Sequence, residues 1–524
     1  MLLSGSVFLI TSDGKTLSLP VPSESPHDPL NWTVKKRVLP LIPVVIFSVT
    51  CLNVTQGSGL VVKGLIRDFR HEAHAPFNIE TLLVAPTLCM GLGAFLWVPL
   101  TFALGRRPSF LIASSLLLIS VVLAGISTNF YGLLLCICAM GFAEGFALSV
   151  VFLIIIDITF IHQRPTSLAA VWSIVGFISG ITLSAIPFCT EHGRDWRGLY
   201  QYWTIPAAVA CLSALFLFPE TYFKRPVVAY DGLTLLQTAS EKLIIYEDDR
   251  FDVRFEENNK TLPAAPSRNW FQDFMDQFYI RSTRASWKSM LACYPQILFC
   301  LLNPLIFWVV IMTAMNFAGM MYIGTTYAVV LSSPPYNLSS SLLIHVNTSS
   351  GVGSLLAWPL GGVLIGRILS RMSRRNKGVR EAEHYLFGYI LPVLTGSLST
   401  LIYGCAVHYK WHFTTYYLSY GLNGFSFVAI SITNTLWVTE AFPRWAAPAL
   451  VVVGGVSYIS SFALSFVLVP WVKVQGYLLV GIELMVLQLL TGLVITPIAF
   501  WGKGLRQRIH GRWADMREGA LRPL

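Results

Sequence analysis

One acidic residue lies deep within an apolar stretch of the chain, at a position that favours proton or cation chemistry. Glu144 lies near the middle of the stretch over residues 131–156. If that stretch crosses a membrane, an ionised carboxylate at this depth costs several kcal/mol unless it pairs, faces water or takes up a proton. We therefore expect Glu144 to bind a proton or another cation. The alternative is a neutral glutamic acid that is hydrogen-bonded between helices.

Three other acids lie in or beside apolar stretches. Glu483 is deep within the last stretch, and there we favour a structural role. Asp157 and Glu440 lie at the ends of their stretches, and we expect them to pair with Arg164 and Arg444. Such pairs contribute appreciably to the energy of a gate only where water is excluded.

A glycine followed by two arginines, Gly105-Arg106-Arg107, ends the second apolar stretch. The small residue permits a tight turn, and the arginines can reach carbonyls at helix ends or carboxylates across a gate. The alternative is an ordinary pair of charges that ends a span. A weaker copy, Gly366-Arg367 followed by Ser373-Arg374-Arg375, ends the eighth stretch. This echo is what duplication of a six-helix unit produces.

The composition indicates an integral membrane protein. Apolar residues make up 54% of the chain and charged residues only 12%, and the mean hydropathy is +0.61. A soluble protein carries roughly twice that share of charge. The net charge of +10 arises from cations that flank apolar stretches, not from a basic and aromatic surface, so we expect no nucleic-acid partner.

The sequence lacks the motifs of an enzyme. It contains no His-Glu-x-x-His metal motif and no Gly-x-Ser-x-Gly nucleophile elbow. Gly14-Lys15-Thr16 lacks the remainder of a phosphate-binding loop. The nine cysteines lie almost all in apolar stretches and are interpreted as small buried side chains. We therefore expect no catalysis, no cofactor and no metal.

Hydropathy divides the chain into twelve stretches long enough to cross a bilayer. The predicted spans are 38–62, 81–104, 108–128, 131–156, 166–188, 200–219, 297–325, 342–366, 386–407, 414–439, 449–470 and 475–500. The predicted organisation is an N-tail over 1–37, a first six-helix bundle over 38–219, a linker over 220–296, a second bundle over 297–500 and a C-tail over 501–524. We expect an all-α fold.

The basic residues predict the orientation of these spans. None of the 37 Lys and Arg residues lies inside a predicted span, and thirty of them lie in the two tails, the linker and alternate loops. By the positive-inside rule, both tails and the linker are cytoplasmic. Asn337, which begins the sequon Asn-Leu-Ser in the external loop after span seven, is then the usable glycosylation site.

Several motifs together resemble the major facilitator superfamily, and within it the fungal twelve-helix branch of drug:proton antiporters and polyamine-type carriers. The motifs are Asp28-Pro29-Leu30-Asn31-Trp32, Pro99-Leu100 through Gly105-Arg106-Arg107, Asp157 with Arg164, Pro219-Glu220-Thr221-Tyr222, and Arg374-Arg375-Asn376-Lys377-Gly378 with Glu381 and Glu383. The sequence departs from the family at Phe102, where the family carries an acid. The span-five signature is also degraded, although Gly176 and Gly180 remain as a helix-packing pair.

The resemblance implies two pseudo-symmetric six-helix bundles around a central cavity. It implies a conformational role for Gly105, Arg106, Arg107, Asp157, Arg164, Arg374 and Arg375. It also places the span of Glu144 against the cavity. The expected cavity residues on spans one, seven and ten are Asn53, Gln56, Trp308, Asn316, Tyr322, Asn423, Asn434 and Trp437. Such amide and aromatic groups suit an amphipathic or cationic organic molecule, although each also serves as a contact between helices.

The function expected from these features is proton-coupled transport of a small organic compound by alternating access. Efflux of a drug-like compound or secondary metabolite is favoured over uptake of a nutrient or polyamine. A membrane sensor that kept the transporter fold is the alternative from another class. The resemblance favours a monomer, and a plasma-membrane location is preferred to an internal membrane.

Overall fold

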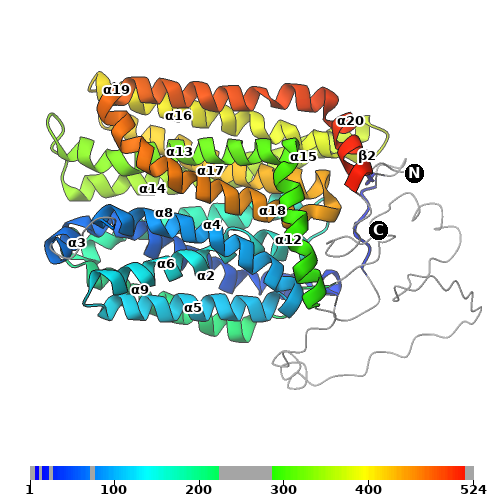
Figure 1. The fold of residues 1–524 in the computed structure, drawn as a ribbon. Helices are drawn as coiled ribbons and strands as arrows, with labels where there is room; N and C mark the ends of the chain where they lie inside the picture. Colours follow the sequence, from blue (N-terminus) through cyan, green and yellow to red (C-terminus); the bar gives the residue numbers. More distant parts are fainter. Residues whose placement is uncertain (1–5, 11–14, 23–27, 71–76, 224–285, 514–524) are drawn as a thin grey trace, which may run out of the picture.

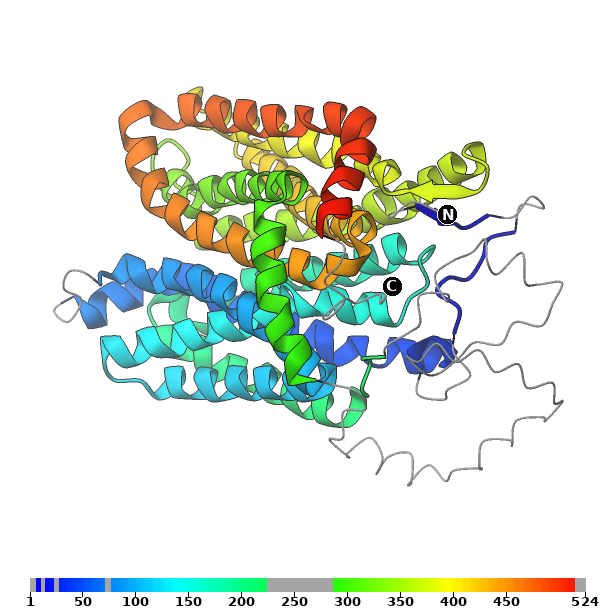
Figure 2. The same cartoon turned by 45° about the vertical axis from the view of Figure 1, so that its right-hand side comes forward.

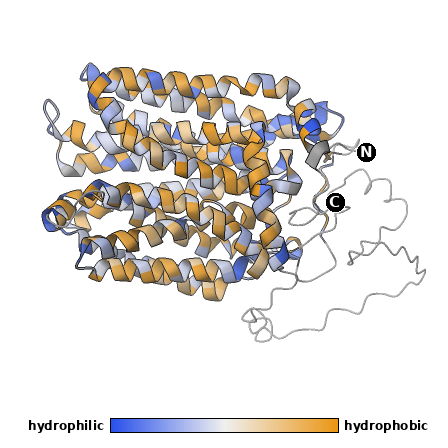
Figure 3. Cartoon of the chain, viewed as in Figure 1, coloured by the Kyte–Doolittle hydropathy of each residue, from blue (hydrophilic) through white to orange (hydrophobic). Residues whose placement is uncertain are grey.

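The computed structural model describes residues 6–10, 15–22, 28–70, 77–223 and 286–513. In this part of the chain long helices run side by side in two groups (Figure 1). Eleven segments have the length and apolar composition to cross a membrane. Apolar residues cover most of their length, and hydrophilic residues gather at their ends (Figure 3). Helices that are apolar on all sides are typical of membrane spans.

The first bundle contains six spans, two of which are interrupted. Its elements are α1 (Val34–Val38), α2 (Leu41–Gln56), η2 (Gly57–Val61), α3 (Val62–Phe69), α4 (Ile79–Leu104), α5 (Arg106–Ile126), α6 (Phe130–Ala147), α7 (Val150–Asp157), α8 (Arg164–Cys189), η3 (Glu191–Gly193) and α9 (Trp196–Leu217). The first span runs through α1, α2, η2 and α3, and the fourth runs through α6 and α7. These bounds agree with the predicted spans to within a few residues at most ends.

The second bundle contains the remaining six spans. Its elements are α12 (Trp287–Leu302), α13 (Pro304–Ser332), α14 (Ser340–Ala357), η5 (Trp358–Leu364), α15 (Ile365–Arg375), η6 (Ala382–Tyr389), α16 (Ile390–His408), α17 (Thr414–Ala441), η7 (Pro443–Trp445), α18 (Ala446–Val451), η8 (Val452–Val456), α19 (Ser457–Leu493) and α20 (Ile495–Trp513). The helix α19 contains parts of the last two spans, Ala446–Leu468 and Pro470–Ile509, and it turns at Gly476, where φ is 82°.

Span seven begins later than predicted. The predicted span 297–325 crosses a break at Asn303, which has an extended backbone and caps α13 by accepting a hydrogen bond from the Leu305 N–H (3.0 Å). Proline at 304 disfavours a helical conformation in the preceding residue. The residues before the break form α12, which crosses from the second bundle to α4 of the first (Figure 2).

The tenth span, α17, is the least apolar of the twelve and falls outside the eleven apolar segments. It contains buried Ser, Thr and Asn side chains along its length. These polar groups are tolerated because α17 packs against α14, α16 and α13 and not against lipid alone.

One end of the two bundles carries the arginine-rich loops, and we call it the basic end. Here β1 (Ser6–Phe8) pairs antiparallel with β2 (Val379–Glu381). The end of α15 and the last turns of α20 also lie at this end (Figure 1). Most of the predicted linker lies outside the described residues.

The two bundles touch along α8 and α14. A Cβ added to Gly180 of α8 would lie 2.7 Å from the Cα of Gly351 in α14, and one added to Gly176 would lie equally close to the Ser354 Cβ. The predicted Gly176 and Gly180 packing pair is therefore confirmed. These residues allow the backbones of the two helices to approach closely.

Candidate functional site

The carboxyl group of Glu144 lies buried at the interface between the two bundles. Its side chain is 1% exposed and accepts a hydrogen bond of 2.7 Å from the Thr55 hydroxyl of α2. Among the described residues no Lys, Arg or His lies within ion-pair distance of it. From the second bundle, Tyr458 of α19 is close enough to Glu144 for an electrostatic interaction. Among the described residues, the groups that surround this carboxyl group are therefore mainly neutral.

Three aromatic side chains continue from Glu144 into the second bundle. The rings of Tyr458 and Phe317 meet edge to face with centroids 5.4 Å apart. Phe317 also contacts Phe427 of α17, at 6.1 Å between centroids. Aromatic faces beside a carboxyl group suit an amphipathic or cationic organic compound. Of these residues, sequence reasoning identified only Glu144.

The predicted cavity residues of α2 differ in exposure. Asn53 is buried, donates to the Val49 carbonyl (2.8 Å) and accepts from Thr182 of α8 (3.1 Å). Gln56, one turn further along, is exposed. A substrate-binding role for Asn53 and Gln56 stays a prediction.

The three predicted asparagines of the second bundle bind partners within that bundle. Asn316 accepts hydrogen bonds from Ser426 (2.9 Å) and Gln488 (3.1 Å). The partners of the others are Ser399 for Asn423, and Tyr389 and Thr313 for Asn434. These bonds join neighbouring helices, which is the packing role set out above as the alternative. A substrate-binding role for the asparagines stays a prediction.

The predicted aromatic cavity residues are also packed within the second bundle. The Trp308 indole donates to the Thr491 carbonyl (2.9 Å), and the Tyr322 hydroxyl donates to the Tyr477 carbonyl (2.6 Å). Trp437 is fully buried. Cavity lining by these three residues likewise stays a prediction.

At the basic end, Arg106 is held by charge, hydroxyl and aromatic contacts. Its guanidinium donates to Asp157 (3.1 Å), and it also donates to Thr101. The same group lies over the rings of Phe102 and Tyr222, 5.6 and 5.1 Å from their centroids. Phe102, which replaces the acid of the family motif, therefore contributes a cation–π contact, and Asp157 supplies the carboxylate.

Glu220 caps the first turn of α5. Its carboxylate accepts from the backbone N–H groups of Arg106 (2.9 Å), Arg107 (3.2 Å) and Tyr222 (2.9 Å). An anion is favourable at a helix N-terminus, where the N–H groups lack partners in the helix. Burial raises the pKa of Glu220, and the three N–H groups and the charge of Arg106 work against this shift.

The turn before α5 requires glycine. Gly105 has φ 100° and ψ 170°, a conformation that is essentially restricted to glycine, and a Cβ there would meet the Glu220 carboxylate. We expect Gly105→Ala to lower the stability of the folded protein by about 1–3 kcal/mol. Thermal unfolding of the purified protein measures this loss. Gly59→Ala is the matched control, because a Cβ there meets nothing within 4 Å, and an equal loss in both variants would contradict the prediction.

A buried ion pair joins the two bundles at the basic end. Arg164 at the start of α8 binds Glu440 near the end of α17, and their side chains are 2% and 5% exposed. This corrects the predicted pair of Asp157 with Arg164, because Asp157 binds Arg106 and Arg164 binds an acid of the other bundle, whereas the predicted pair of Glu440 with Arg444 stays a prediction. The side chain of Arg444 is not among those described. Tyr385 is close enough to Arg164 and Glu440 to interact electrostatically with both.

The second half of the chain also contains a glycine turn that an arginine follows. This turn lies at Gly378 and not at Gly366, where the sequence repeat predicted it. Gly366 is inside helix α15, whereas Gly378 has φ 80° and precedes the buried Arg380 by two residues. Arg374 and Arg375 are exposed in the last turn of α15. Their predicted gating role stays a prediction.

Two ion pairs join the C-terminal helix α20 to β2 and η6, which directly follow this turn. Arg506 is fully buried and binds Glu383 (3.0 Å), and Lys503 binds Glu381. Partial burial works to raise the pKa of Glu381, but the hydrogen bond and charge of Lys503 outweigh it and lower the pKa. Sequence reasoning noted Glu381 and Glu383 only as parts of a motif and did not identify their partners.

The N-terminal segment contacts both bundles at the basic end. Its strand β1 pairs with β2 of the second bundle, and the Leu9 N–H donates to the Gly378 carbonyl (2.9 Å). Further along, the Leu19 carbonyl accepts from the Ile161 N–H (2.7 Å) in the loop between α7 and α8. Leu9, Leu19 and Ile161 also belong to one apolar cluster. We call residues 6–10 and 15–19 the strap.

Comparison with known families identifies the architecture. The sequence profile of the Major Facilitator Superfamily matches residues 46–465. The chain belongs to the major facilitator superfamily. It is accordingly a multi-pass membrane transporter and not an enzyme. In the described residues, no group of three or more His, Cys, Asp or Glu side chains has the geometry of a metal site.

Relatives of this superfamily member match over nearly the whole chain. An uncharacterized MFS-type transporter of Schizosaccharomyces pombe is 22% identical over 95% of this chain and 89% of its own length. Efflux pump radE of Floropilus chiversii is 23% identical over 94% of this chain and 84% of its own length. The human organic anion transporter MFSD10 shares the fold, with a TM-score of 0.51 and 13% identity over 90% of this chain and 100% of that chain.

Asn337 lies in the loop between α13 and α14, at the end opposite to the basic end, and its side chain is exposed. This position is compatible with its predicted glycosylation. We expect the protein from a glycosylating host to migrate faster in gels after endoglycosidase treatment. The Asn337→Gln variant should show no such shift, and an unchanged shift in that variant would contradict the prediction.

Proposed function

We propose that this transporter exports a small organic compound in exchange for protons, by alternating access, and that Glu144 is the proton site. The observation that carries this proposal is a buried carboxyl group at the bundle interface with Thr55 as its hydrogen-bond donor. In apolar surroundings its ionised form is stable only with water or a cation nearby. Protonation of Glu144 thus favours states in which water is excluded from the carboxyl group. Release of the proton favours states in which water reaches it.

The orientation follows from the positive-inside rule, which we take to place the basic end in the cytoplasm. At that end Arg164 and Glu440 join the bundles, so this structure represents the state closed to the cytoplasm. The Arg106 network lies within the first bundle and supports the turn beside this gate. Asn337 is then external.

The export direction and substrate class are supported by two observations. Relatives include efflux pump radE and multidrug transporter FLR2 of Candida glabrata, the latter 24% identical over 46% of this chain. The aromatic cluster of Phe317, Phe427 and Tyr458 lies on the second-bundle side of Glu144, where it provides stacking surface for an organic compound. We place the transporter in the plasma membrane as a monomer.

Flux measurements on reconstituted vesicles test the proposal. Purified protein in sealed vesicles is screened against drug-like amines, aromatic metabolites and polyamines, with and without an imposed pH gradient. The proposal predicts that at least one compound accumulates against its concentration gradient, on the side from which protons leave. Accumulation on the side that protons enter indicates uptake by symport and overturns the export direction. Binding without flux of any compound indicates a sensor.

The strap is expected to favour the cytoplasm-closed state, because it is attached to both bundles at the gate. Deletion of residues 2–10 removes β1, and we expect a several-fold larger population with the basic end open, since a few backbone hydrogen bonds of about 1 kcal/mol each are lost. Electron paramagnetic resonance distances between labels at Gln163 and Arg375, both exposed, measure this population. Deletion of residues 2–5 is the control, because it leaves β1 intact. Equal distance distributions in the two deletions would contradict the prediction.

A further inference from the structure

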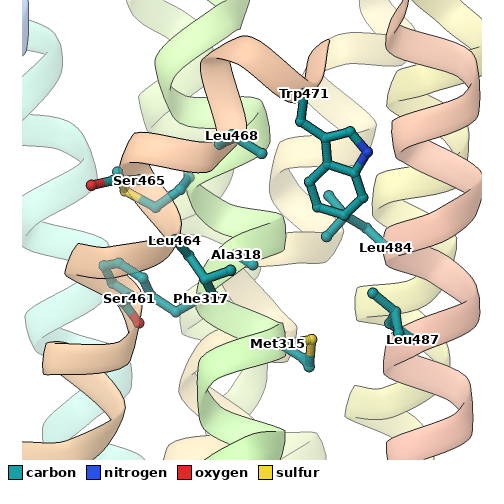
Figure 4. Close-up of a pocket in the computed structure, with 11 residues that line it drawn as sticks. Met315, Phe317, Ala318, Ser461, Leu464, Ser465, Leu468, Trp471, Leu484 and Leu487 are labelled. Carbon is teal, nitrogen blue, oxygen red and sulfur yellow. The ribbon is translucent and has the colours of Figure 1, made fainter. Parts of the chain in front are cut away.

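A small apolar pocket lies within the second bundle, and one of its lining residues, Phe317, also belongs to the aromatic cluster beside Glu144. It is formed between α13 and the two halves of α19, and its volume is about 110 Å³ (Figure 4). Its walls include Met315 and Ala318 of α13, Leu464 and Leu468 of the first half of α19, and Leu487 of the second half. A space of this size accepts a ring or a short alkyl group, since an engineered apolar cavity of about 150 Å³ binds benzene.

The two serines of the pocket do not make it polar. The Ser461 hydroxyl donates to the Ser457 carbonyl (2.7 Å), and the Ser465 hydroxyl donates to the Phe462 carbonyl (2.6 Å). Both hydrogen bonds are made to the backbone of the same helix, and the wall that these residues present is effectively apolar. An apolar wall favours a hydrophobic group but provides no selectivity for one.

A carboxylate binds one of the residues that line this pocket. The Trp471 ring lies across the pocket between the two halves of α19 (Figure 4). Its indole N–H donates to the carboxylate of Glu483 (2.9 Å) and to Gln475 (2.7 Å). Glu483 directly precedes the pocket residue Leu484 and lies one helical turn before Leu487, on the same face of the helix as Leu487.

The charge of Glu483 lacks a counterion within the described part of the chain. No Lys, Arg or His described in the structure lies within ion-pair distance of its oxygens. The side chain is half-buried within a span, where a carboxylate with one indole and no cation is costly. The hydrogen bond between Trp471 and Glu483 joins the two halves of α19 but does not compensate the charge of the Glu483 carboxylate.

We infer that this pocket is a second, peripheral binding site for a lipophilic amine. The hydrophobic group enters the pocket beneath Trp471, and the ammonium group binds the Glu483 carboxylate. Apolar burial and charge complementarity then act on one ligand, which explains why an acid stands beside an otherwise apolar wall. Glu144 does not line the pocket, and the inference does not depend on proton coupling.

Equilibrium binding to purified protein in lipid nanodiscs tests the inference, with empty nanodiscs as the background. The probes are 4-phenylbutylamine and its neutral analogue 4-phenyl-1-butanol. We expect the amine to bind more tightly than the alcohol, and Glu483→Gln to weaken amine binding at least tenfold with little effect on the alcohol. Leu484→Trp, which fills the pocket, should weaken both probes. In the Glu144→Gln background, Glu483→Gln should still weaken amine binding at least tenfold.

Four outcomes would overturn the inference. Equal binding of the two probes, or amine binding that Glu483→Gln leaves unchanged, shows an apolar occupant such as a lipid chain. Loss of amine binding in Glu144→Gln and not in Glu483→Gln places the amine at the bundle interface. If Glu483→Gln does not fold, Trp471→Phe serves instead, because it keeps the carboxylate and a ring. It should retain the amine preference, and loss of that preference contradicts the site.

Discussion

Replacing Glu144 with glutamine is expected to abolish gradient-driven accumulation of the transported compound while leaving its downhill exchange intact. Glutamine keeps the size of the side chain and accepts the Thr55 hydrogen bond, but it cannot release a proton. A gradient of one pH unit supports about a tenfold concentration ratio for one proton exchanged per molecule. We expect wild type to approach that ratio and Glu144→Gln to stay at about one.

Two further variants separate the charge from the packing. Glu80→Gln removes an exposed acid in the first turn of α4 and should accumulate substrate like wild type. Thr55→Val removes the hydrogen bond but keeps the titrating group, so coupling should persist with a changed pH dependence. Tracer accumulation and tracer exchange in the same vesicles supply both readouts. Wild-type accumulation by Glu144→Gln would show that the carboxyl group is structural.

The second large effect is expected at the Arg164 and Glu440 pair. Removal of one partner of a buried ion pair costs about 3–5 kcal/mol, because the remaining charge stays in a site built for two. This loss destabilises the state in which the pair is formed, which is the state closed at the basic end. Arg164→Gln and Glu440→Gln should therefore each shift the protein towards the state open at the basic end, and lower transport at least about tenfold.

The double variant is the control for this prediction. With both residues changed to glutamine, neither charge of this pair remains without the other, and the shift should be smaller than in either single variant. Distances between labels at Gln163 and Arg375 report the closed and open populations directly. Single variants with the wild-type distance distribution would contradict a gating role for the pair, and so would a double variant that opens more than both.

The elements that depend on local sequence were predictable. The spans follow from apolar length, and Glu144 was identifiable because an acid in the middle of an apolar stretch needs a special explanation. The Gly105 turn was recognisable because a glycine separates two apolar stretches and two arginines follow. Asn303 and Pro304 also indicate that α13 starts late. Hydropathy averaged over many residues does not resolve so short a break, so the predicted span ran across it.

The partners of the charged residues were not predictable. Arg164 and Glu440 are 276 positions apart and come from different bundles, and Arg506 lies 123 positions from Glu383. Their pairing depends on how the bundles pack, which no local pattern encodes. The direction in which a polar side chain points within an apolar helix is equally hidden, as the hydrogen bonds of Asn316 and Asn434 inside the second bundle illustrate.

In the proposed function, substrate movement and proton movement are coupled through Glu144. The most direct measurement uses vesicles that contain a trapped pH indicator and receive a substrate gradient without a pH gradient. Wild type is predicted to move protons in the direction opposite to the substrate, at a rate proportional to substrate flux, and Glu144→Gln is predicted to move substrate without a pH change. Substrate flux in wild type without proton movement, or equal proton movement in both proteins, would contradict the account.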